Sequence, residues 1–570
     1  MNGTEWIIFI LIIQGIHFLG TWKLYVKAGR KAWEAAIPIY NAIVLMQIIN
    51  RPKWWVVLLF IPIINLLMFP VIWVETIRSF GRNSRLETWL VVLTLGFYIY
   101  YVNYALEVTY IKDRSLHPKT AMGEWVSSIL FAVVAATLVH TYFIQPYVIP
   151  TGSLERTLRV GDFLFVSKFH YGARTPMTTV AAPMVHDTLP VLGVPSYLKK
   201  PQLPYFRLPG FTKVERNDIV VFSWPADTVR VFFKKEKGVN KPIDKKSNYV
   251  KRCVGIPGDS LEVRNGYVFI DGKQLELPGS AKPQFDYTIY SSKGVSSRIF
   301  EKLGVTDYTR KYLSNPLNQD QVNGLRSILV GYDQGPNGQI ELYTKSTGIS
   351  ANLISKLRLS LKEVTDRERL VALTADMVNT LKNDPSIDSV VQNVSPIGRR
   401  GVNLFPQSPD YPWNYSQLGP IYIPKKGTTV ALNLKVLPLY KKIIREYEGN
   451  TLSVTGNQIT INDQPANSYT FQQDYYWMMG DNRDHSEDSR AWGYVPENHI
   501  VGTPIFIWMS FDNFTEGIAN WRPRWDRIFT TVNGEGEPQS YFKYFLILLV
   551  AYFVGNWFWK RRTSKSEQHR

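Results

Sequence analysis

The chain has 570 residues and a formal net charge of +18, with 45% hydrophobic and 20% charged residues. This length allows several domains, each able to bury its own core. The single cysteine, Cys253, excludes an intramolecular disulfide and a zinc site of several thiolates. No H-E-x-x-H spacing supports a metal-dependent mechanism. Many Lys and Arg residues flank apolar stretches, where they suit loops facing anionic lipid, so the charge does not indicate nucleic-acid binding.

Apolar stretches dominate the N-terminal part of the chain. Residues 4–20 lack a basic n-region and a small-residue cleavage site, which indicates a retained anchor. Other stretches have about the 20 residues that a helix needs to cross the hydrocarbon core. They are 54–76, 88–111, 124–144 and, near the C-terminus, 541–559. The last one ends in aromatic residues and a basic run, which is typical of an interface with a cytoplasmic tail.

The stretch 35–50 is short and contains a proline, so it suits an interfacial or re-entrant helix as well as a span. If 124–144 runs outward, the loop 112–119 lies inside the cell. The basic stretch 23–31 also lies inside if 35–50 does not cross. The loop 78–85, with its arginines, then lies outside, against the positive-inside tendency.

From about residue 150 the chain changes to short β-rich runs separated by turns. The run 261–272 contains Asn265-Gly266, a strong hairpin signal, and 452–462 forms a second such unit. These runs predict a mainly β domain. Residues 280–450 differ in character, with a helix-like segment at 354–381 and a stretch rich in proline and aromatic residues. They are interpreted as an insertion without a catalytic motif of its own.

The first segment with chemical potential is I-P-T-G-S-L-E-R-T-L, residues 149–158, directly after an apolar stretch. Pro150 and Gly152 bracket Thr151 in an extended strand or turn that exposes Ser153. A serine beside a glycine is most often only a turn residue, so this segment alone does not establish a nucleophile.

The second segment is N-Y-V-K-R-C-V-G-I-P-G-D, residues 248–259. It begins as a strand, with Tyr249, Lys251 and Cys253 on one face and Val250 on the other. A lysine in such a strand either extends to solvent or is kept neutral by desolvation. In the second case burial lowers its pKa and makes it a usable general base.

The third segment is M-M-G-D-N-R-D-H-S-E-D-S-R-A-W-G-Y-V-P, residues 478–496. An exposed acidic loop is the usual explanation for so many charges. Alternating Asp and Arg between apolar flanks also suits a fixed, mutually neutralised ion network that supports a site.

Together, in this order and after an apolar span, these segments closely resemble bacterial type I signal peptidase (leader peptidase), a serine protease family with a Ser-Lys dyad. The third segment matches the family's G-D-N-R-D-x-S-x-D-S-R box at every fixed position. R-N-D-I-V-V-F, residues 216–222, resembles its structural strand box, with Asn217 where glycine is usual. The resemblance covers roughly 124–275 and 450–510.

The resemblance implies roles for individual residues. Ser153 stands at the nucleophile position and Lys251 at the general base. Ser486 matches the serine that orients the lysine, and Thr151 would complete the oxyanion hole with the Ser153 N–H. The remaining matches belong to the family's ion network, which comprises Arg252, Asp481, Asp488 and Arg490, and to its shallow substrate pockets, which comprise Tyr147, Ile149 and Val250.

The implied reaction is endoproteolysis of signal-peptide-bearing precursor proteins after an A-x-A-type motif, through an acyl-enzyme and without metal or cofactor. Leader peptides are cut after translocation. We therefore expect a multi-pass protein of the bacterial inner (cytoplasmic) membrane, with its catalytic domain on the periplasmic or outer side. The export machinery is a further candidate partner, and no nucleic acid is expected.

The chain departs from the family pattern at two positions. Leu154 replaces the usual methionine, which is a near-isosteric change. Arg156 stands where proline is general, which would loosen the turn after the serine or place a positive charge near lipid headgroups. Neither position touches the dyad.

The expected fold is a mainly β, signal-peptidase-like catalytic domain with a large α/β insertion, an N-terminal helical transmembrane domain and a C-terminal transmembrane helix. The predicted parts are a multi-span membrane domain at 1–122, a transmembrane helix at 123–145, the catalytic domain at 146–275 and 451–530, the insertion at 276–450 and the last helix at 541–560.

Three alternatives remain open on these residues. A Ser-His-Asp hydrolase would use His485, at a variable position of the third segment. A self-cleaving repressor would share the Ser-Lys chemistry. The apolar spans and the absence of a DNA-binding segment in the sequence argue against it. A non-enzymatic platform would bind exported chains without cutting them. The insertion itself is expected to shape substrate access or to bind a partner.

Overall fold

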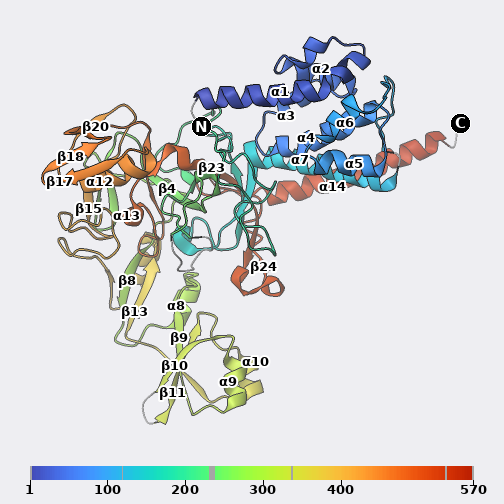
Figure 1. Ribbon diagram of the computed structural model, residues 1–570. Helices are drawn as coiled ribbons and strands as arrows, with labels where there is room; N and C mark the ends of the chain where they lie inside the picture. Colours follow the sequence, from blue (N-terminus) through green and yellow to red (C-terminus); the bar gives the residue numbers. More distant parts are fainter. Residues whose placement is uncertain are drawn as a thin grey trace.

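A computed structural model describes residues 3–118, 120–229, 238–334, 338–532, 534 and 536–567 of the chain. Figure 1 shows an N-terminal helical unit, a central sheet, a smaller β domain beside the sheet, and a projecting module on the side away from the helices. The predicted class, mainly β with helices near both ends, is confirmed at this level. Of the expected inner loop 112–119, residue 119 lies outside the described residues.

The N-terminal helical unit consists of one long helix followed by short ones. Their apolar faces share one core, which includes Leu24, Val44, Ile77 and Val102. The helices are α1 (Gly3–Lys27), α2 (Tyr40–Ile48), α3 (Trp55–Leu58), α4 (Ile64–Ser79), α5 (Arg85–Leu93) and α6 (Tyr98–Tyr104).

The predictions of single spanning helices at 54–76 and 88–111 are wrong. The first stretch is broken at Ile63, whose φ is 70°, and the second at Leu95 and Gly96, whose φ values are 51° and 87°. A positive φ cannot continue a right-handed helix. Hydropathy alone therefore overestimated the length of these helices, because the chain turns inside each apolar stretch.

The structure has three helices that are long and apolar enough to cross a membrane among the described residues: Ile7–Lys27, Ala121–Tyr142 and Phe542–Arg561. They correspond to the anchor, the span before the catalytic domain and the C-terminal span of the sequence analysis. The stretch 35–50 contains α2, which has nine residues and at 1.5 Å per residue is too short to cross about 30 Å of hydrocarbon.

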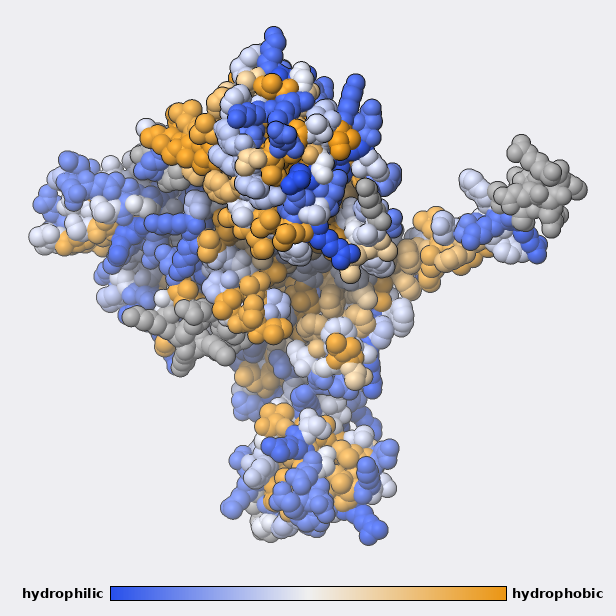
Figure 2. Space-filling view, turned by 45° about the vertical axis from the view of Figure 1, so that its right-hand side comes forward, coloured by the Kyte–Doolittle hydropathy of each residue, from blue (hydrophilic) through white to orange (hydrophobic). Residues whose placement is uncertain are grey.

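α7 (Ala121–Tyr142) and α14 (Phe542–Glu567) carry exposed apolar side chains along their lengths, such as Trp125, Phe131, Tyr544 and Leu548. Figure 2 shows the apolar band along the projecting C-terminal helix and hydrophilic residues beyond it. Side chains of this kind are stable on a surface that contacts lipid.

A nine-stranded antiparallel sheet forms the centre of the molecule. Strand β3 is buried on both faces: Ile219 and Val221 pack into one apolar cluster and Val220 and Phe222 into another. This is why the strand is a continuous apolar run instead of an alternating one. The path of the sheet is β1 (Ile144–Val148), β2 (Asp162–Ser167), β23 (Ile500–Asp512), β3 (Ile219–Ser223), β4 (Asn248–Gly255), β21 (Tyr475–Met479) and β22 (Val495–Pro496), and β24 (Arg522–Pro523) and β25 (Thr530–Thr531) pair with β23.

The smaller β domain contains both predicted hairpins. Asn265 and Gly266 have φ values of 51° and 84°, which is the geometry of a type I′ turn. Its strands are β5 (Ser260–Arg264), β6 (Tyr267–Ile270), β7 (Lys273–Gln274) and β15 (Leu418–Tyr422) in one sheet, β17 (Leu452–Thr455), β18 (Gln458–Ile461) and β19 (Gln464–Pro465) in a second, and β16 (Thr429–Ala431) with β20 (Ser468–Thr470).

Only part of the predicted insertion stands apart from the β domains. Its C-terminal portion returns to the smaller β domain, where Leu404, Leu418, Leu437 and Ile443 join Val263 in one core. The helices there and in the preceding part are α12 (Leu437–Lys442), α8 (Ser297–Lys302) and α11 (Ala375–Lys382), and a three-stranded sheet is made of β8 (Phe285–Tyr290), β13 (Glu368–Leu373) and β14 (Ser389–Gln392).

The projecting module, residues 309–364, has a separate apolar core that includes Tyr312, Leu325, Leu342 and Leu359. The expectation of a helix-like segment at 354–381 is wrong, because two strands, β12 and β13, lie inside it. The elements of the module are β9 (Thr309–Ser314), α9 (Gln319–Leu325), β10 (Leu329–Gln334), β11 (Ile340–Lys345), α10 (Ala351–Leu357) and β12 (Leu361–Val364).

Candidate active site

Lys251 lies on β4, in the middle of the central sheet, opposite Val220 of β3. The predicted alternation is confirmed, because Tyr249 and Cys253 pack into one apolar cluster and Val250 into the other. Lys251 itself is only 2% exposed. No carboxylate among the described residues pairs with its ammonium group. Of the two interpretations of this lysine, the structure supports desolvation.

The position of Lys251 lowers its pKa from the ordinary value of 10.5 to about 8. Burial is the largest cause, because it disfavours the charged ammonium, and the carboxylate of Asp488 opposes it in part. The Nζ atom donates to Ser486 Oγ at 3.1 Å. A lysine with this pKa has a substantial neutral fraction near pH 8 and can accept a proton there.

Ser153 lies in a short 3₁₀ turn, Gly152–Leu154, that follows the extended residue Thr151. The next side chain, Leu154, is 1% exposed and anchors the turn in the core beside the central sheet. Asn482 holds the turn from the other side: its backbone N–H donates to the Ser153 carbonyl and its Nδ2 to the Gly152 carbonyl, both at 3.1 Å. Ser153 is therefore half-buried with a fixed backbone.

The turn that contains Ser153 packs closely against Gly480, and so does the side chain of Ser486. A side chain at Gly480 would collide with Ser486 Oγ and with the Ser153 carbonyl oxygen. The structure thus brings together Ser153, Ser486 and Lys251, which come from three separate parts of the sequence. No hydrogen bond joins Ser153 Oγ to Lys251 Nζ among the described residues. Such contacts between catalytic groups are often long before substrate binds.

Two buried bidentate ion pairs lie next to Lys251 and Ser486 in the sequence. Arg252 donates to the two carboxylate oxygens of Asp481 at 2.8 and 2.7 Å, and Arg490 to those of Asp488 at 2.9 and 2.8 Å. All four side chains are at most 1% exposed. The Arg252 guanidinium, together with hydrogen bonds, keeps the pKa of Asp481 below its usual value despite burial. The predicted ion network therefore exists as two neutral pairs.

The ion pairs also fix the backbone around Ser153 and Ser486. Asp481 Oδ2 accepts from Thr157 Oγ1 at 2.6 Å, which ties the segment after Ser153 to the third segment, residues 478–496. Asp488 Oδ2 accepts from the Gly480 N–H at 3.1 Å, which closes the loop that carries Ser486. The buried Asp481 and Asp488 thus position the loop, whereas Asp484 and Glu487 of the same segment are exposed.

Asn217 stands where glycine is usual in the resembled family, and its backbone conformation explains why this replacement is tolerated. Its φ is 76°, a conformation that glycine adopts freely and asparagine tolerates better than most residues. Its carbonyl accepts from Arg252 Nη1 at 2.7 Å. Asparagine can therefore replace the usual glycine while the carbonyl remains available to Arg252.

Tyr147, Ile149 and Val250 pack in the same apolar cluster, with Ile149 buried and the other two half-buried. Tyr147 OH accepts from Asn248 Nδ2 at 3.2 Å, which links β1 to β4 although other strands separate them within the sheet. The sheet therefore curves until these strands face each other. Tyr147 and Val250 therefore lie in one cluster although they belong to strands that are not neighbours in the sheet.

Arg156, at the position where proline is general in the resembled family, adopts a φ of 73°. Proline cannot adopt this angle. The Arg156 side chain donates to the carbonyl of Gly304, in the segment after α8. The arginine therefore contacts the insertion.

Gln284 is a site residue that the sequence analysis missed. It is 4% exposed, and its N–H donates to the Asp481 carbonyl at 2.8 Å while its carbonyl accepts from the Arg483 N–H at 2.9 Å. Its Nε2 donates to the Glu155 carbonyl at 2.8 Å. Gln284 therefore joins the turn of Ser153 to the loop of Ser486. No charge or spacing pattern marks it in the sequence.

No hydrogen bond joins His485 to Ser153 among the described residues. Its Nε2 lies 2.9 Å from Asp286 Oδ1, at the start of the insertion, and half of its side chain is exposed. The hydrogen bond to Asp286 raises the pKa of His485. This geometry gives no support to the alternative in which His485 acts as the base of a triad.

Thr151 is exposed, and its hydroxyl makes no capping hydrogen bond to the turn that follows. In the described parts of the chain, no three His, Cys, Asp or Glu side chains gather where they could hold a metal ion.

Family models match two parts of the chain. One described as "Signal peptidase, peptidase S26" matches residues 122–315 and 423–509. The other, a family of unknown function (DUF5684), matches residues 33–113. The first match covers α7 and the strands that carry the candidate site, and the second covers most of the helical unit that follows α1. The projecting module lies almost wholly in the stretch that neither matches.

Curated relatives point in the same direction. The chain is 23% identical over 418 residues to the signal peptidase I of Buchnera aphidicola subsp. Acyrthosiphon pisum, which covers 72% of this chain and 85% of the relative. It is 24% identical over 433 residues to the signal peptidase I of Haemophilus influenzae, covering 74% and 79%. The match to the signal peptidase I of Rickettsia massiliae is shorter, 27% over 158 residues.

Proposed function

Because the chain belongs to the signal peptidase family, peptidase S26, we propose that it is a membrane-bound serine endopeptidase that removes N-terminal signal peptides from exported precursor proteins. The observation that carries this proposal is the state of Lys251. A buried lysine with a pKa of about 8 and a hydrogen bond to Ser486 Oγ is suited to accept a proton from a serine.

Ser153 is the nucleophile in the proposed reaction. Its Oγ attacks the scissile carbonyl carbon while its proton passes to neutral Lys251, and the resulting ammonium protonates the leaving amine. The acyl-enzyme on Ser153 is then hydrolysed by a water that Lys251 deprotonates. Ser486 keeps the Nζ atom oriented through both steps. General base catalysis of this kind contributes about 10²–10⁴-fold to the rate.

The oxyanion of each tetrahedral intermediate would be stabilised by the Ser153 N–H and the Thr151 hydroxyl. The rigid backbone supports this role, because Asn482 fixes the carbonyls of Gly152 and Ser153. One donor of this type typically contributes about 3 kcal/mol to transition-state stabilisation.

The substrate is proposed to bind as an extended chain beside β1. Among the described strands β1 lies at the end of the sheet and pairs only with β2, so its other edge can accept a peptide strand. The apolar surface of Tyr147, Ile149 and Val250 would take small side chains upstream of the cut, which suits an A-x-A-type motif.

The enzyme is proposed to reside in the bacterial inner membrane, with the catalytic domain on the periplasmic or outer side and the loop 112–119 in the cytoplasm. Cys253, the only cysteine, is fully buried, so single engineered cysteines can report topology. A membrane-impermeant maleimide added to intact spheroplasts should label Lys293→Cys and leave Asp113→Cys unlabelled until lysis. The opposite pattern would reverse this orientation.

Cleavage of a purified precursor with an A-x-A motif tests the activity and its residues. Wild type and His485→Ala should release the mature chain, whose new N-terminus mass spectrometry identifies. Ser153→Ala and Lys251→Ala should release none. If Lys251→Ala retained cleavage activity and His485→Ala lost it, the mechanism would be a triad with His485 as the base. A folded wild type that cleaves no precursor would favour a binding platform, with the protein-export machinery as its candidate partner.

A further inference from the structure

A cavity of about 170 Å³ lies between α7, the central sheet and the helical unit. Thr137, His140 and Thr141 line it from the last turns of α7, Gln145 and Tyr147 from β1, and Ile63 from the start of α4. A single water needs roughly 10–15 Å³ of such space, so this cavity holds several water-sized groups. Neither Ser153 nor Lys251 lines it.

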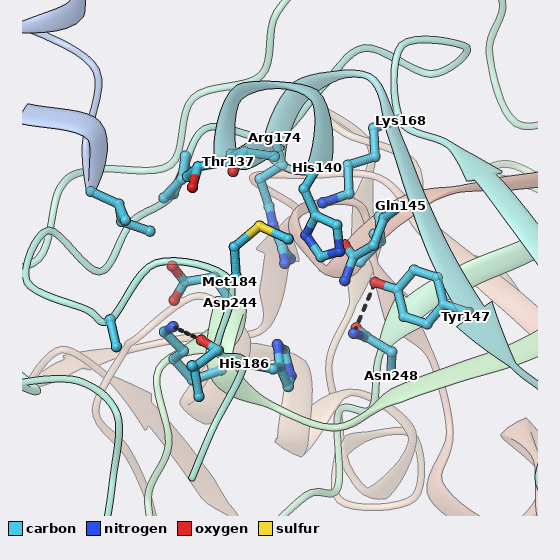
Figure 3. A pocket seen from close by; sticks show the side chains of 17 residues that line it. Thr137, His140, Gln145, Tyr147, Lys168, Arg174, Met184, His186, Asp244 and Asn248 are labelled. Atoms are coloured by element: carbon cyan, nitrogen blue, oxygen red, sulfur yellow. Dashed lines mark hydrogen bonds between the residues drawn. The ribbon is translucent and has the colours of Figure 1, made fainter. Parts of the chain in front are cut away.

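The lining of the cavity carries an excess of positive charge. Lys168, Arg174 and Lys245 face a single carboxylate, Asp244. That carboxylate already accepts hydrogen bonds from the N–H and the hydroxyl of Thr178, at 2.9 and 2.7 Å. Figure 3 shows the side chains of Lys168, Arg174 and His140 around the same space.

Among these positive charges, the ammonium group of Lys168 is not neutralised by a partner among the described residues. Its Nζ atom has no hydrogen-bond or ion-pair partner among the described residues, whereas Arg174 donates to Asn498 O at 2.9 Å and to Ser223 Oγ at 3.2 Å. Burial, and then the charge of Arg174, lower the pKa of Lys168 to about 7. A partly buried ammonium group with no partner is costly, and an anion in the cavity would remove that cost.

The position of the cavity indicates which anion is available. His140 and Thr141 lie in the last turn of α7, one of the helices long enough to span a membrane, and the catalytic sheet starts directly after it. This level of a membrane protein is the headgroup layer. Ile63, Met184 and Val185 add apolar lining beside the charged groups, which suits a glycerol backbone attached to a phosphate.

We propose that this cavity binds the phosphate of a membrane phospholipid, with Lys168 as its principal ligand and Arg174 and Lys245 as further positive charges. Basic pockets beside transmembrane helices are suited to anionic headgroups, and Lys is an effective point charge for phosphate. A bound lipid would fix the catalytic sheet on the bilayer next to Tyr147. The inference depends on the membrane placement of α7 and is independent of peptidase activity.

Lipid binding by the detergent-purified full chain tests this proposal. Native mass spectrometry with phosphatidylglycerol should give about tenfold weaker binding for Lys168→Gln and Lys168→Met, and near wild-type binding for Lys168→Arg. Lys273→Gln is the matched control, because it removes an exposed lysine from β7, and it should bind as wild type does. Unchanged binding in Lys168→Gln would overturn the proposal.

The ligand controls separate the sources of the anion. A neutral glycolipid with the same acyl chains should bind weakly in wild type, and equal binding would mean that the acyl chains alone are recognised. Excess inorganic phosphate should displace little phosphatidylglycerol, and complete displacement would make free phosphate the ligand and overturn the lipid assignment.

Thermal stability and peptide cleavage show whether lost lipid binding has another cause. Lys168→Met removes a partly buried ammonium without a partner, so its thermal midpoint in lipid-free detergent should equal or exceed that of wild type, which excludes misfolding as the cause of lost binding. Cleavage of a short A-x-A peptide in the same detergent should be unchanged in Lys168→Gln. A raised KM there would make the cavity a substrate subsite and overturn the lipid proposal.

Discussion

The Nζ atom of Lys251 lies 3.1 Å from Ser486 Oγ, and both side chains are almost fully buried, at 2% and 4% exposure. This contact fixes the lysine by a neutral hydroxyl group instead of a carboxylate. A carboxylate partner would stabilise the ammonium form and raise the lysine pKa. A hydroxyl orients the same nitrogen without that effect, so the lysine stays close to its neutral form.

The activity should depend on pH through Lys251. The neutral lysine is the active base, so kcat/KM of peptide cleavage should rise about tenfold per pH unit below the lysine pKa and level off above about 8. Ser486→Ala should lower kcat on the order of tenfold, because the Nζ atom loses one orienting hydrogen bond, while the profile keeps its shape. A flat profile between pH 6 and pH 9 would contradict the assignment of Lys251.

The same lysine should reduce stability. Its folded-state pKa is about 8 against an ordinary 10.5, so at neutral pH the folded protein holds a buried ammonium at a cost of about 3 kcal/mol. Lys251→Met should therefore abolish cleavage and raise the thermal midpoint at pH 7.

The pH dependence of the stability gained by Lys251→Met tests whether the lysine charge is its cause. Between about pH 8 and 10.5 the unfolded state binds more protons than the folded state, so wild-type stability should rise with pH over this range. The advantage of Lys251→Met should accordingly shrink towards pH 10.5. A constant difference across pH would mean that packing, and not the lysine charge, causes the effect.

Asp481→Asn should be strongly destabilising. It leaves the guanidinium of Arg252, which is 1% exposed, without its charged partner and weakens the hydrogen bond from Thr157. Removing one partner of a buried ion pair costs about 3–5 kcal/mol. Glu262→Gln is the matched control, because its partner Arg264 is exposed, and its unfolding midpoint should equal that of wild type. Equal midpoints for both variants would refute the structural role of the buried pair.

The parts of the site that are local in sequence could be predicted from it. The hairpin at Asn265-Gly266 follows from turn chemistry, and the faces of β4 follow from the two-residue period of a strand. Lys251 could be placed on a strand in this way, although its burial could not, because that depends on β3 and β21 on either side of β4.

Contacts between distant segments could not be predicted from local patterns. The contacts of Gln284 with Glu155 and Asp481 join three segments, and a glutamine in an insertion carries no signal of that role. In the helical unit, Glu75 pairs with Arg51 and Arg114 in the interior. Hydropathy treats such charges only as interruptions, whereas folding neutralises them against each other and lets the short helices pack into a compact unit.

Asn217→Gly and Asn217→Ala should differ in stability. Both lose the amide contact of Asn217 with the Glu276 carbonyl, so the comparison isolates the backbone. At a φ of 76° the alanine Cβ costs about 1–2 kcal/mol and glycine does not pay this cost. Asn217→Gly should therefore unfold close to wild type, and Asn217→Ala earlier. Equal midpoints would mean that the turn relaxes to another conformation.

The projecting module, residues 309–364, should be removable. Its first and last strands, β9 and β12, are antiparallel neighbours, with Lys311 opposite Val364, so its ends are one strand spacing and two residues apart, roughly 8 Å. A short Gly-Ser linker between Tyr308 and Thr365 can span this distance. Because the module has its own core, the shortened enzyme should cleave a short A-x-A peptide within about twofold of wild type.

Removing residues 285–445 is the contrasting experiment. It also deletes Leu418 and Leu437, which belong to the core of the smaller β domain, and each lost buried leucine costs about 2–5 kcal/mol, so this protein should fail to fold. If the module governs substrate access, its deletion should change the relative cleavage rates of full-length precursors while leaving the short peptide unaffected. Unchanged rates for every precursor would exclude that role, and equal loss of peptide cleavage would show that the module is needed to hold the site together.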